Sequence, residues 1–380
     1  MAKERNAFDN VKGKEDSHYL LLNKDVVIAK FHVDEKINII RIDSIEEELP
    51  FWISDLSGFI INRRAPKHRE NIEKLLEVSG CNTTKGFLDV THALSLIDTF
   101  WVKPVDSSLS WEDVSLFSHP FDEAVAKTAF EGGLHGRDFS NTSPEYGTDG
   151  SFAKCWVRED DQIKLLKRGS SGARNAGLEP YSEYYASQLI EAFTDDFVPY
   201  DLRSRSGRIC SVCNIFTSEQ YGFLPYAAVG NRGNSTYLNV IKRYDELIGC
   251  GDFAKMMFII DAVILNEDRH TNNFGFLVDN ERQEIVAPAP LFDHNIAMLP
   301  YAEKEDFEKV DEYLKQKGPR LGQDWIGPAV DCMTSKCKKA LINLHGFKFK
   351  KHLRYNWPDW RIEAMEQLIN RNIETVLDLL

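Results

Sequence analysis

The hydrophobic pattern in the first third of the chain changes once, from alternation to helical spacing. Residues 19–33 alternate as two strands around a turn at residues 23–25, and residues 37–42 and 51–61 continue the strand pattern. Apolar residues then recur at helical spacing in three segments, 68–80, 84–98 and 122–132. We therefore expect a small α/β domain over residues 1–132, whose polar first 16 residues are frayed.

A polar loop rich in Gly, Ser, Asn and Asp, residues 133–151, separates this domain from a second region with strand character. Pro180 is well placed as the first residue of a helix within that region. The predicted elements are two strands, that helix and two further strands, at 152–159, 162–169, 180–193, 208–216 and 221–229. This pattern predicts a strand-rich lobe over residues 133–230.

The remainder of the chain, residues 231–380, is mainly helical in its spacing. Residues 236–249 form one predicted helix, and residues 252–266 form another that is apolar nearly all round, as a buried central helix would be. A last helix follows Pro358. The fold class predicted is α+β, with a strand-rich lobe and a helical lobe arranged as in protein kinases and preceded by the small α/β domain.

Composition narrows the class of protein further. The chain is 43% hydrophobic and 28% charged, as in soluble globular proteins. Its formal net charge of −13 argues against direct nucleic-acid binding, which rewards clustered Lys and Arg. We find neither a run of about 18 apolar residues nor an apolar segment after the N-terminal charges, so we expect no membrane span and no signal peptide. These features indicate a cytoplasmic protein.

The seven cysteines have irregular spacing, apart from a C-x-x-C pair at Cys210 and Cys213. Both residues of this pair lie in the predicted strand 208–216, where side chains three apart point to opposite faces. A shared zinc ion or disulfide is therefore disfavoured, and reduced thiols are expected.

The segment 264–277, ILNEDRHTNNFGFL, places a cluster of polar residues between two apolar runs. In protein kinases, an Asp in such a loop takes the substrate hydroxyl, and an Asn five residues later binds Mg²⁺. Asp268 and Asn273 have this spacing. A predicted hairpin follows and ends at Asp293, the position of the second metal ligand in kinases. By itself the Asp–Asn spacing also fits a capped turn, and the hairpin makes the catalytic interpretation the better one.

A kinase also needs a strand lysine that contacts the ATP phosphates and a glutamate on a helix. The strand 162–169 offers Lys164 and Lys167 on opposite faces, and we assign Lys167. Glu183 lies one turn into the next helix and is the predicted partner. Glu179 and Glu191 are expected to be solvated helix charges.

The loop YGTDGSF precedes the lysine strand and could place backbone N–H groups on phosphates. It lacks the Walker and G-x-G-x-x-G patterns, so its position carries the argument. The predicted ATP-binding residues are Gly147, Gly150, Ser151, Lys167, Glu183 and Phe216.

These motifs resemble the HipA-like serine/threonine kinases, a bacterial family that includes HipA toxins and the smaller CtkA-like kinases. Asn266, Asp268, His270 and Asn273 match its N-x-D-x-H-x-x-N loop, and APAPLFDH matches the segment that carries its metal-binding aspartate. The resemblance covers roughly residues 140–345. It implies ATP and Mg²⁺ as cofactors and a protein Ser or Thr as acceptor. Some members are toxins restrained by a small antitoxin protein.

The resemblance further implies that a serine in the glycine loop can be autophosphorylated, for which Ser143 and Ser151 are the candidates. The segment after the metal-binding aspartate departs from the usual kinase pattern. His294 and Asn295, rather than Phe and Gly, follow the metal-binding aspartate, so switching of that segment is not assumed.

The same loop pattern also occurs in phosphatidylinositol kinases, which leaves three roles open for His270: acid/base, charge stabiliser or hydrogen-bonded strut. A lipid or small-molecule kinase and a nucleotide-binding pseudokinase scaffold are the alternatives to a protein kinase.

Overall fold

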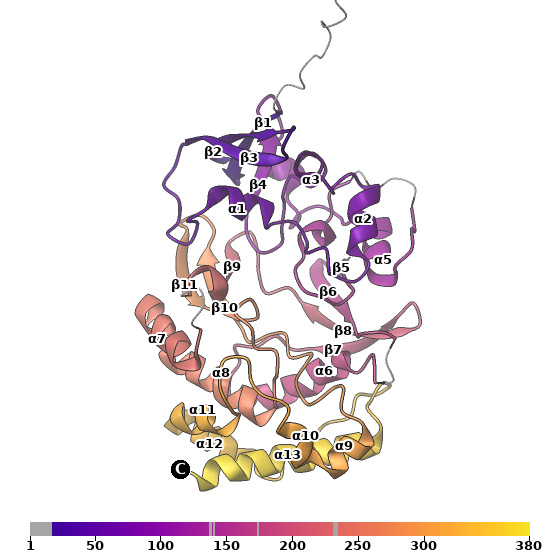
Figure 1. Cartoon of the computed structure of the whole chain (residues 1–380), viewed down its shortest axis with the longest axis vertical. Coiled ribbons are helices and arrows are strands. Elements are labelled where there is room, and N and C mark those ends of the chain that lie inside the picture. Colours follow the sequence, from indigo (N-terminus) through magenta and orange to yellow (C-terminus); the bar gives the residue numbers. More distant parts are fainter. Residues whose placement is uncertain (1–16, 137–138, 140, 173–174, 231–234) are drawn as a thin grey trace, which may run out of the picture.

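The computed structural model describes residues 17–136, 139, 141–172, 175–230 and 235–380. The predicted frayed segment 1–16 lies outside these residues. Figure 1 shows an elongated molecule with the N-terminal sheet at one end, the C-terminal helices at the other and two further sheets between them. Within the described residues, none of the helices combines the length and apolarity needed to cross a bilayer.

The N-terminal part is built on a four-stranded antiparallel sheet in the order β3-β2-β1-β4. Its strands are β1 (Ser17–Asn23), β2 (Val26–Asp34), β3 (Ile39–Ile45) and β4 (Phe100–Pro104). The helices beside it are α1 (Leu56–Ile61), α2 (Ile72–Val78), α3 (Thr84–Thr91), α4 (Trp111–Val114) and α5 (Glu123–Glu131). One face of the sheet packs against α1, α2, α3 and α5 in a shared hydrophobic core.

The strand predicted for residues 51–61 is wrong, because its second half forms helix α1. The cause is local: the Asp55 carboxylate accepts a hydrogen bond from the Gly58 N–H at 3.0 Å and caps the helix. Alternating hydrophobicity alone missed this capping signal. The sequence pattern also missed β4, which pairs with β1 at the edge of the sheet.

The second sheet carries the predicted lysine strand. Its order is β5-β6-β8-β7, and all of its pairs are antiparallel. Its elements are β5 (Lys154–Glu159), β6 (Gln162–Arg168), β7 (Asp201–Arg205) and β8 (Arg208–Asn214), with helix α6 (Glu179–Ile190) between β6 and β7. A tight turn between Glu159 and Gln162 closes the β5–β6 hairpin. A short 3-10 helix, η1 (Pro144–Gly147), precedes β5.

The third sheet joins distant parts of the chain. Strand β9 (Tyr221–Pro225) pairs with β10 (Gly275–Asp279), which forms a hairpin with β11 (Glu284–Pro288). The hairpin predicted before Asp293 is therefore present. Because β9 comes before residue 230 and the hairpin comes after it, backbone hydrogen bonds connect the two predicted lobes.

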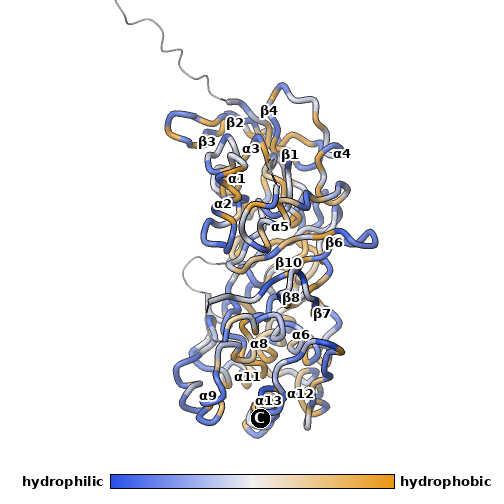
Figure 2. The backbone as a smooth tube through the Cα atoms, turned by 90° about the vertical axis from the view of Figure 1, so that its right-hand side faces the viewer, coloured by the Kyte–Doolittle hydropathy of each residue, from blue (hydrophilic) through white to orange (hydrophobic). Residues whose placement is uncertain are grey.

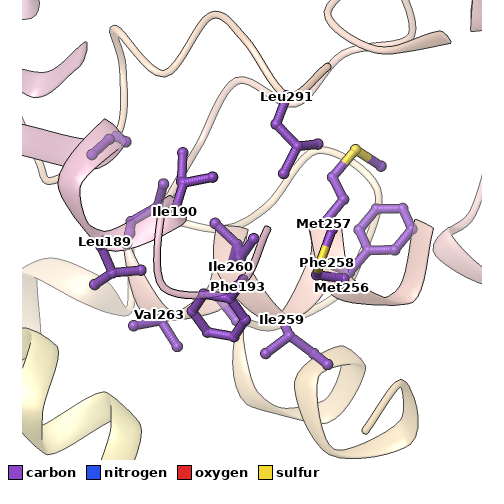
Figure 3. Packing of buried hydrophobic residues seen from close by; sticks show 14 of the residues in the cluster. Leu189, Ile190, Phe193, Met256, Met257, Phe258, Ile259, Ile260, Val263 and Leu291 are labelled. Carbon is purple, nitrogen blue, oxygen red and sulfur yellow. The ribbon is translucent and has the colours of Figure 1, made fainter. Parts of the chain in front are cut away.

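The C-terminal region is helical and surrounds α8 (Gly251–Val263). The other helices are α7 (Tyr237–Ile248), α9 (Lys304–Glu308), α10 (Val310–Leu314), α11 (Ile326–Asp331), α12 (Ser335–Asn343) and α13 (Asp359–Asp378). Figure 2 shows α8 as a hydrophobic segment inside this region. Figure 3 shows Met257, Ile260 and Val263 of α8 among Leu189, Ile190 and Phe193 from α6 and the residues after it. The predicted buried central helix is confirmed.

Polar contacts hold the N-terminal part against the third sheet. The Asn23 side-chain N–H donates to the Asn280 carbonyl at 2.7 Å, and the Phe223 N–H donates to the Ile97 carbonyl at 2.7 Å. The Thr217 hydroxyl donates to the Leu96 carbonyl at 2.5 Å. The β10–β11 hairpin is thus held by backbone pairing on one side and by the N-terminal part on the other.

Candidate active site

Lys167 lies at the centre of the candidate site. It points from β6 toward Glu183 on α6, with which it forms a buried ion pair, and its Nζ lies 2.5 Å from the Asp293 carboxylate beyond β11. The Ser211 hydroxyl of β8 also donates to Glu183. Lys164 lies on the other face of the strand and pairs with Glu159 at 3.4 Å. Three separate elements therefore bring Lys167, Glu183 and Asp293 together.

Burial and opposite charges act against each other in this cluster. Burial disfavours the charge of Lys167, but Asp293 and Glu183 outweigh it and raise the lysine pKa above its usual value. Burial likewise disfavours the charge of Asp293, but Lys167 and then Lys154 hold its pKa well below its usual range. Burial raises the pKa of Glu183, and Lys167 limits that rise. Lys167 and Asp293 are therefore both charged near neutral pH.

The polar loop after α8 supplies Asp268 and Asn273. The Asn273 side-chain nitrogen donates to the Asp268 carbonyl at 3.1 Å, so its amide oxygen is the end of the side chain available as a metal ligand. The Asp268 carboxylate is partly exposed and pairs with Arg320 Nε at 2.7 Å. Next to it, Lys317 pairs with Glu267 at 3.0 Å. The loop that carries Asp268 therefore contacts a basic segment that contains Lys317 and Arg320.

Arg269 connects the parts of this site, and the sequence patterns did not single it out. Its buried guanidinium donates two hydrogen bonds of 2.9 Å to Asp261 on α8. It also donates to the carbonyls of Asn273 at 2.8 Å and Phe292 at 2.9 Å. The loop and the segment that carries Asp293 are thus joined through one side chain. The Asn266 amide contributes by donating to the same aspartate, at 2.9 Å.

His294 takes the place of the Phe that follows the metal-binding aspartate in most kinases. Its Nε2 lies 2.7 Å from the Arg269 guanidinium, which has only donors, so this nitrogen accepts. Burial, followed by the charge of Arg269, lowers the pKa of His294 well below its usual value. Asp293 itself has a left-handed backbone conformation, with φ 60°.

His270 is partly exposed, and its Nδ1 accepts the backbone N–H of Asn272 at 3.2 Å. This bond gives the ring a supporting role within the loop. Of the three roles that the sequence left open, this hydrogen bond supports the strut.

The glycine loop contacts the site through its second glycine. Gly150 has φ +97°, and a side chain there would meet the Lys154 ammonium. Gly147 packs instead against the backbone carbonyls of Leu94 and Arg63 in the N-terminal part. The Ser151 side chain is exposed. Only the later part of the predicted loop thus reaches the lysine cluster.

Lys154 is a further basic residue that the sequence patterns missed. It lies directly opposite Lys167 in the β5–β6 pair, so both side chains share one face of the sheet. Burial, together with the charge of Lys167, lowers the pKa of Lys154 to about 8. Its Nζ donates to the Asp149 carbonyl at 2.7 Å. The signal that could have found it is this cross-strand register.

The other candidates have varied surroundings. Ser143 is buried and donates to the Glu145 carboxylate at 2.5 Å. Phe216 packs edge-on against Phe223 and at a tilt against Phe292, at centroid distances of 5.6 and 5.2 Å. The expectation that Glu179 is a solvated charge is wrong, because it is buried and accepts a hydrogen bond from the Tyr301 hydroxyl at 2.8 Å.

The two cysteines of the C-x-x-C pair lie on strand β8 and differ in burial, as expected for side chains on opposite faces. Cys210 is buried, Cys213 is partly buried, and both thiols are free. The cysteines of the described chain are all free in the structure. Burial raises the pKa of both residues of the pair. These thiols are therefore poor nucleophiles.

No protein-family model matches the chain. Its sequence is similar to the serine/threonine-protein kinase CtkA of Helicobacter pylori, with 26% identity over 156 residues. The match covers 37% of this chain and 47% of that kinase, so the chain spans about half the length of this curated relative.

Two solved structures resemble the chain in three dimensions. The proinflammatory kinase CtkA of Helicobacter pylori matches with a TM-score of 0.50 and 18% identity, over 62% of this chain and 93% of that chain. A chain of the Shewanella oneidensis complex of HipA, HipB and operator DNA matches with a TM-score of 0.54 and 11% identity, over 95% and 99% of the two chains.

The chain has a HipA-like kinase fold. The resemblance to HipA-like kinases and the two-lobed fold expected from the sequence are thereby confirmed. The HipA-like match extends over the N-terminal sheet as well, since it covers nearly the whole chain.

Proposed function

We propose that this HipA-like protein is an ATP- and Mg²⁺-dependent kinase that phosphorylates a Ser or Thr hydroxyl of a protein. The observation that carries the proposal is the position of Lys167 between Glu183 and Asp293, with Arg269 joining that segment to the Asp268 loop. Phosphoryl transfer depends mainly on positioning and electrostatics, which such a rigid cluster of charges can supply.

The donor atoms suit magnesium. Asn273 and Asp293 offer an amide oxygen and a carboxylate, the hard oxygen ligands that Mg²⁺ prefers. When bound, Mg²⁺ would neutralise charge on the phosphates of ATP. Lys167, oriented by Glu183, would hold the phosphates, and Gly150, together with Ser151, would cover them. Gly147 and Phe216 stay in the proposal as outer residues of the ATP site.

Asp268 is the proposed group that orients the acceptor hydroxyl and takes its proton. Its carboxylate is partly exposed, so an acceptor can reach it. His270 would support the loop. The three proposed domains, residues 1–132, 133–230 and 231–380, would then supply an N-terminal extension, the ATP-binding lobe and the lobe that carries Asp268.

For autophosphorylation we propose Ser151 rather than Ser143. Ser151 is exposed in the glycine loop, whereas the Ser143 hydroxyl is buried against Glu145. We further propose a small antitoxin-like protein as a partner, because the HipA structure that this chain resembles is in a complex with HipB. A toxin-like role would follow from that partnership.

The test is incubation with labelled ATP and Mg²⁺, followed by mass spectrometry of the protein and of cell extract. We expect phosphate on Ser or Thr, lost in both Asp268→Asn and Asp293→Asn. Label that survives both substitutions would overturn the assignment of the site. Transfer only to lipids or small molecules would favour the alternative acceptors, and a thermal shift with ATP but no transfer would favour a scaffold.

A further inference from the structure

The N-terminal sheet carries a second cluster of metal-binding side chains, far from the chemistry proposed above. His18 on β1, His32 on β2 and Asp43 on β3 come from three adjacent strands at one end of the molecule (Figure 1). The Nδ1 atoms of His32 and His18 lie 2.7 and 3.6 Å from the two Asp43 carboxylate oxygens. The three ligand atoms all lie within 4.8 Å of one another.

The strand register explains why these three residues meet. His18 is directly opposite His32 in the β1–β2 pair, so the two imidazoles share one face, with ring centroids 5.4 Å apart. Between β2 and β3 the register shifts: Ile42 is opposite Phe31, and Ser44 is opposite Lys30. Asp43 is therefore the extra residue of a β-bulge, a feature that redirects side chains.

We propose that His18, His32 and Asp43 bind a divalent transition-metal ion of the Zn²⁺ class. Two imidazole nitrogens and one carboxylate oxygen form a ligand set that zinc uses when a fourth, open position holds water. Ligand atoms about 2.1 Å from a tetrahedral ion lie about 3.4 Å apart, so the observed separations need only small side-chain movements. His18 and Asp43 are well exposed, which gives an ion access from solvent.

The charge of the surroundings is compatible with this site. Arg41 lies opposite His32 on the neighbouring strand, but its guanidinium is directed to Asp34, with Nε 3.7 Å from the carboxylate. A bound ion would replace the His32–Asp43 hydrogen bond with two metal–ligand bonds. It would also cross-link three strands of the sheet, and so it would stabilise the N-terminal part independently of ATP.

The experiment is isothermal titration of the full, untagged and chelator-treated chain with ZnCl₂. We expect one ion per chain, with affinity reduced at least tenfold in His32→Ala and in Asp43→Asn. His345→Ala is the matched control, because His345 is an exposed histidine that pairs with a single carboxylate, Glu374, at 3.5 Å. It should bind Zn²⁺ as the wild type does.

Two further measurements keep the result unambiguous. Circular dichroism of each variant verifies the fold, so that lost binding is not mistaken for unfolding. Titration with Co²⁺ should give an absorption spectrum free of thiolate charge-transfer bands. Equal Zn²⁺ affinity in the wild type and His32→Ala, or a thiolate band that marks a cysteine site, would overturn the proposal.

Discussion

The candidate active site has a proposed nucleotide side around Lys167 and a proposed acceptor side around Asp268, and different kinds of ion pair hold the two sides. On the nucleotide side, Lys167, Glu183 and Asp293 form ion pairs inside the protein, where the exposed fractions of the Lys167 and Glu183 side chains are 8% and 0%. On the acceptor side, Asp268 pairs with Arg320, whose side chain is 59% exposed. Buried pairs are hardly screened by salt, whereas exposed pairs are weak and easily exchanged. The fold therefore fixes the proposed nucleotide side, whereas a substrate could replace the ion pair on the proposed acceptor side.

The largest effect is expected for Lys167→Met, which tests whether the nucleotide side is structural as well as catalytic. Removing the lysine leaves the buried Glu183 carboxylate and the partly buried Asp293 carboxylate without their cation, at a cost of about 3–5 kcal/mol in the free energy of unfolding. Phosphoryl transfer should be lost as well. Urea denaturation and the labelled-ATP assay measure the two effects.

Lys164→Met is the matched control, since Lys164 lies on the same strand and pairs with Glu159 on the other face. That pair is partly exposed, so its loss should cost less than about 1 kcal/mol. If both variants lose the same stability, the contrast between the two sides of the site is wrong.

Asp268→Asn should separate activity from stability on the acceptor side. We expect turnover to fall by about 10²–10⁴-fold, as for the loss of a group that takes a proton in the transition state. The midpoint of urea unfolding should stay close to that of the wild type, because the ion pair lost among the described residues, Asp268–Arg320, is partly exposed to solvent. A large loss of stability would show that the acceptor side is also part of the structural framework.

Lys154 predicts a pH dependence of ATP binding. With a pKa of about 8 in the free protein, it carries a charge below pH 8 and loses it as the pH rises. Since phosphates favour the charged form, ATP affinity should fall above pH 8, by at most about tenfold per pH unit. Titrations between pH 7 and 9.5 measure this. Lys154→Arg stays charged, so its ATP affinity should be nearly flat with pH; a slope like that of the wild type would contradict the assignment.

The smallest effect is expected for Arg320→Gln. The Arg320–Asp268 pair competes with an acceptor hydroxyl for the carboxylate, and an exposed pair is worth up to about 1 kcal/mol. We expect activity at low salt to rise by about two- to fivefold, and the difference from the wild type to shrink at high salt. Arg282→Gln, an exposed arginine on the hairpin turn, is the control. Equal salt dependence in wild type and Arg320→Gln would refute the competition.

Sequence patterns predicted the helices and strands whose formation depends on residues close together in the chain. The β10–β11 hairpin, the buried helix α8 and the strand that bears Lys167 follow from hydrophobic period and turn residues. Helix α1 was missed because a single capping side chain, Asp55, decided between strand and helix.

The supporting contacts of the site could not be predicted in this way. Arg269 reaches residues from three segments, and Lys154 is placed by strand register, so both depend on the tertiary fold. Arg320 comes from a segment about 50 positions after its partner Asp268 and shares no motif with it.

The bond between Arg269 and His294 has a consequence for small-molecule binding. Swinging the Asp293 segment outward would remove two acceptors from a buried guanidinium, His294 Nε2 and the Phe292 carbonyl. The guanidinium would keep its ion pair with Asp261, but each donor left without an acceptor in the interior costs about 1–3 kcal/mol. Inhibitors that occupy the space vacated by such a swing should therefore bind this protein weakly. Compounds shaped for the closed arrangement meet no such penalty, and they are the better starting point for chemical probes.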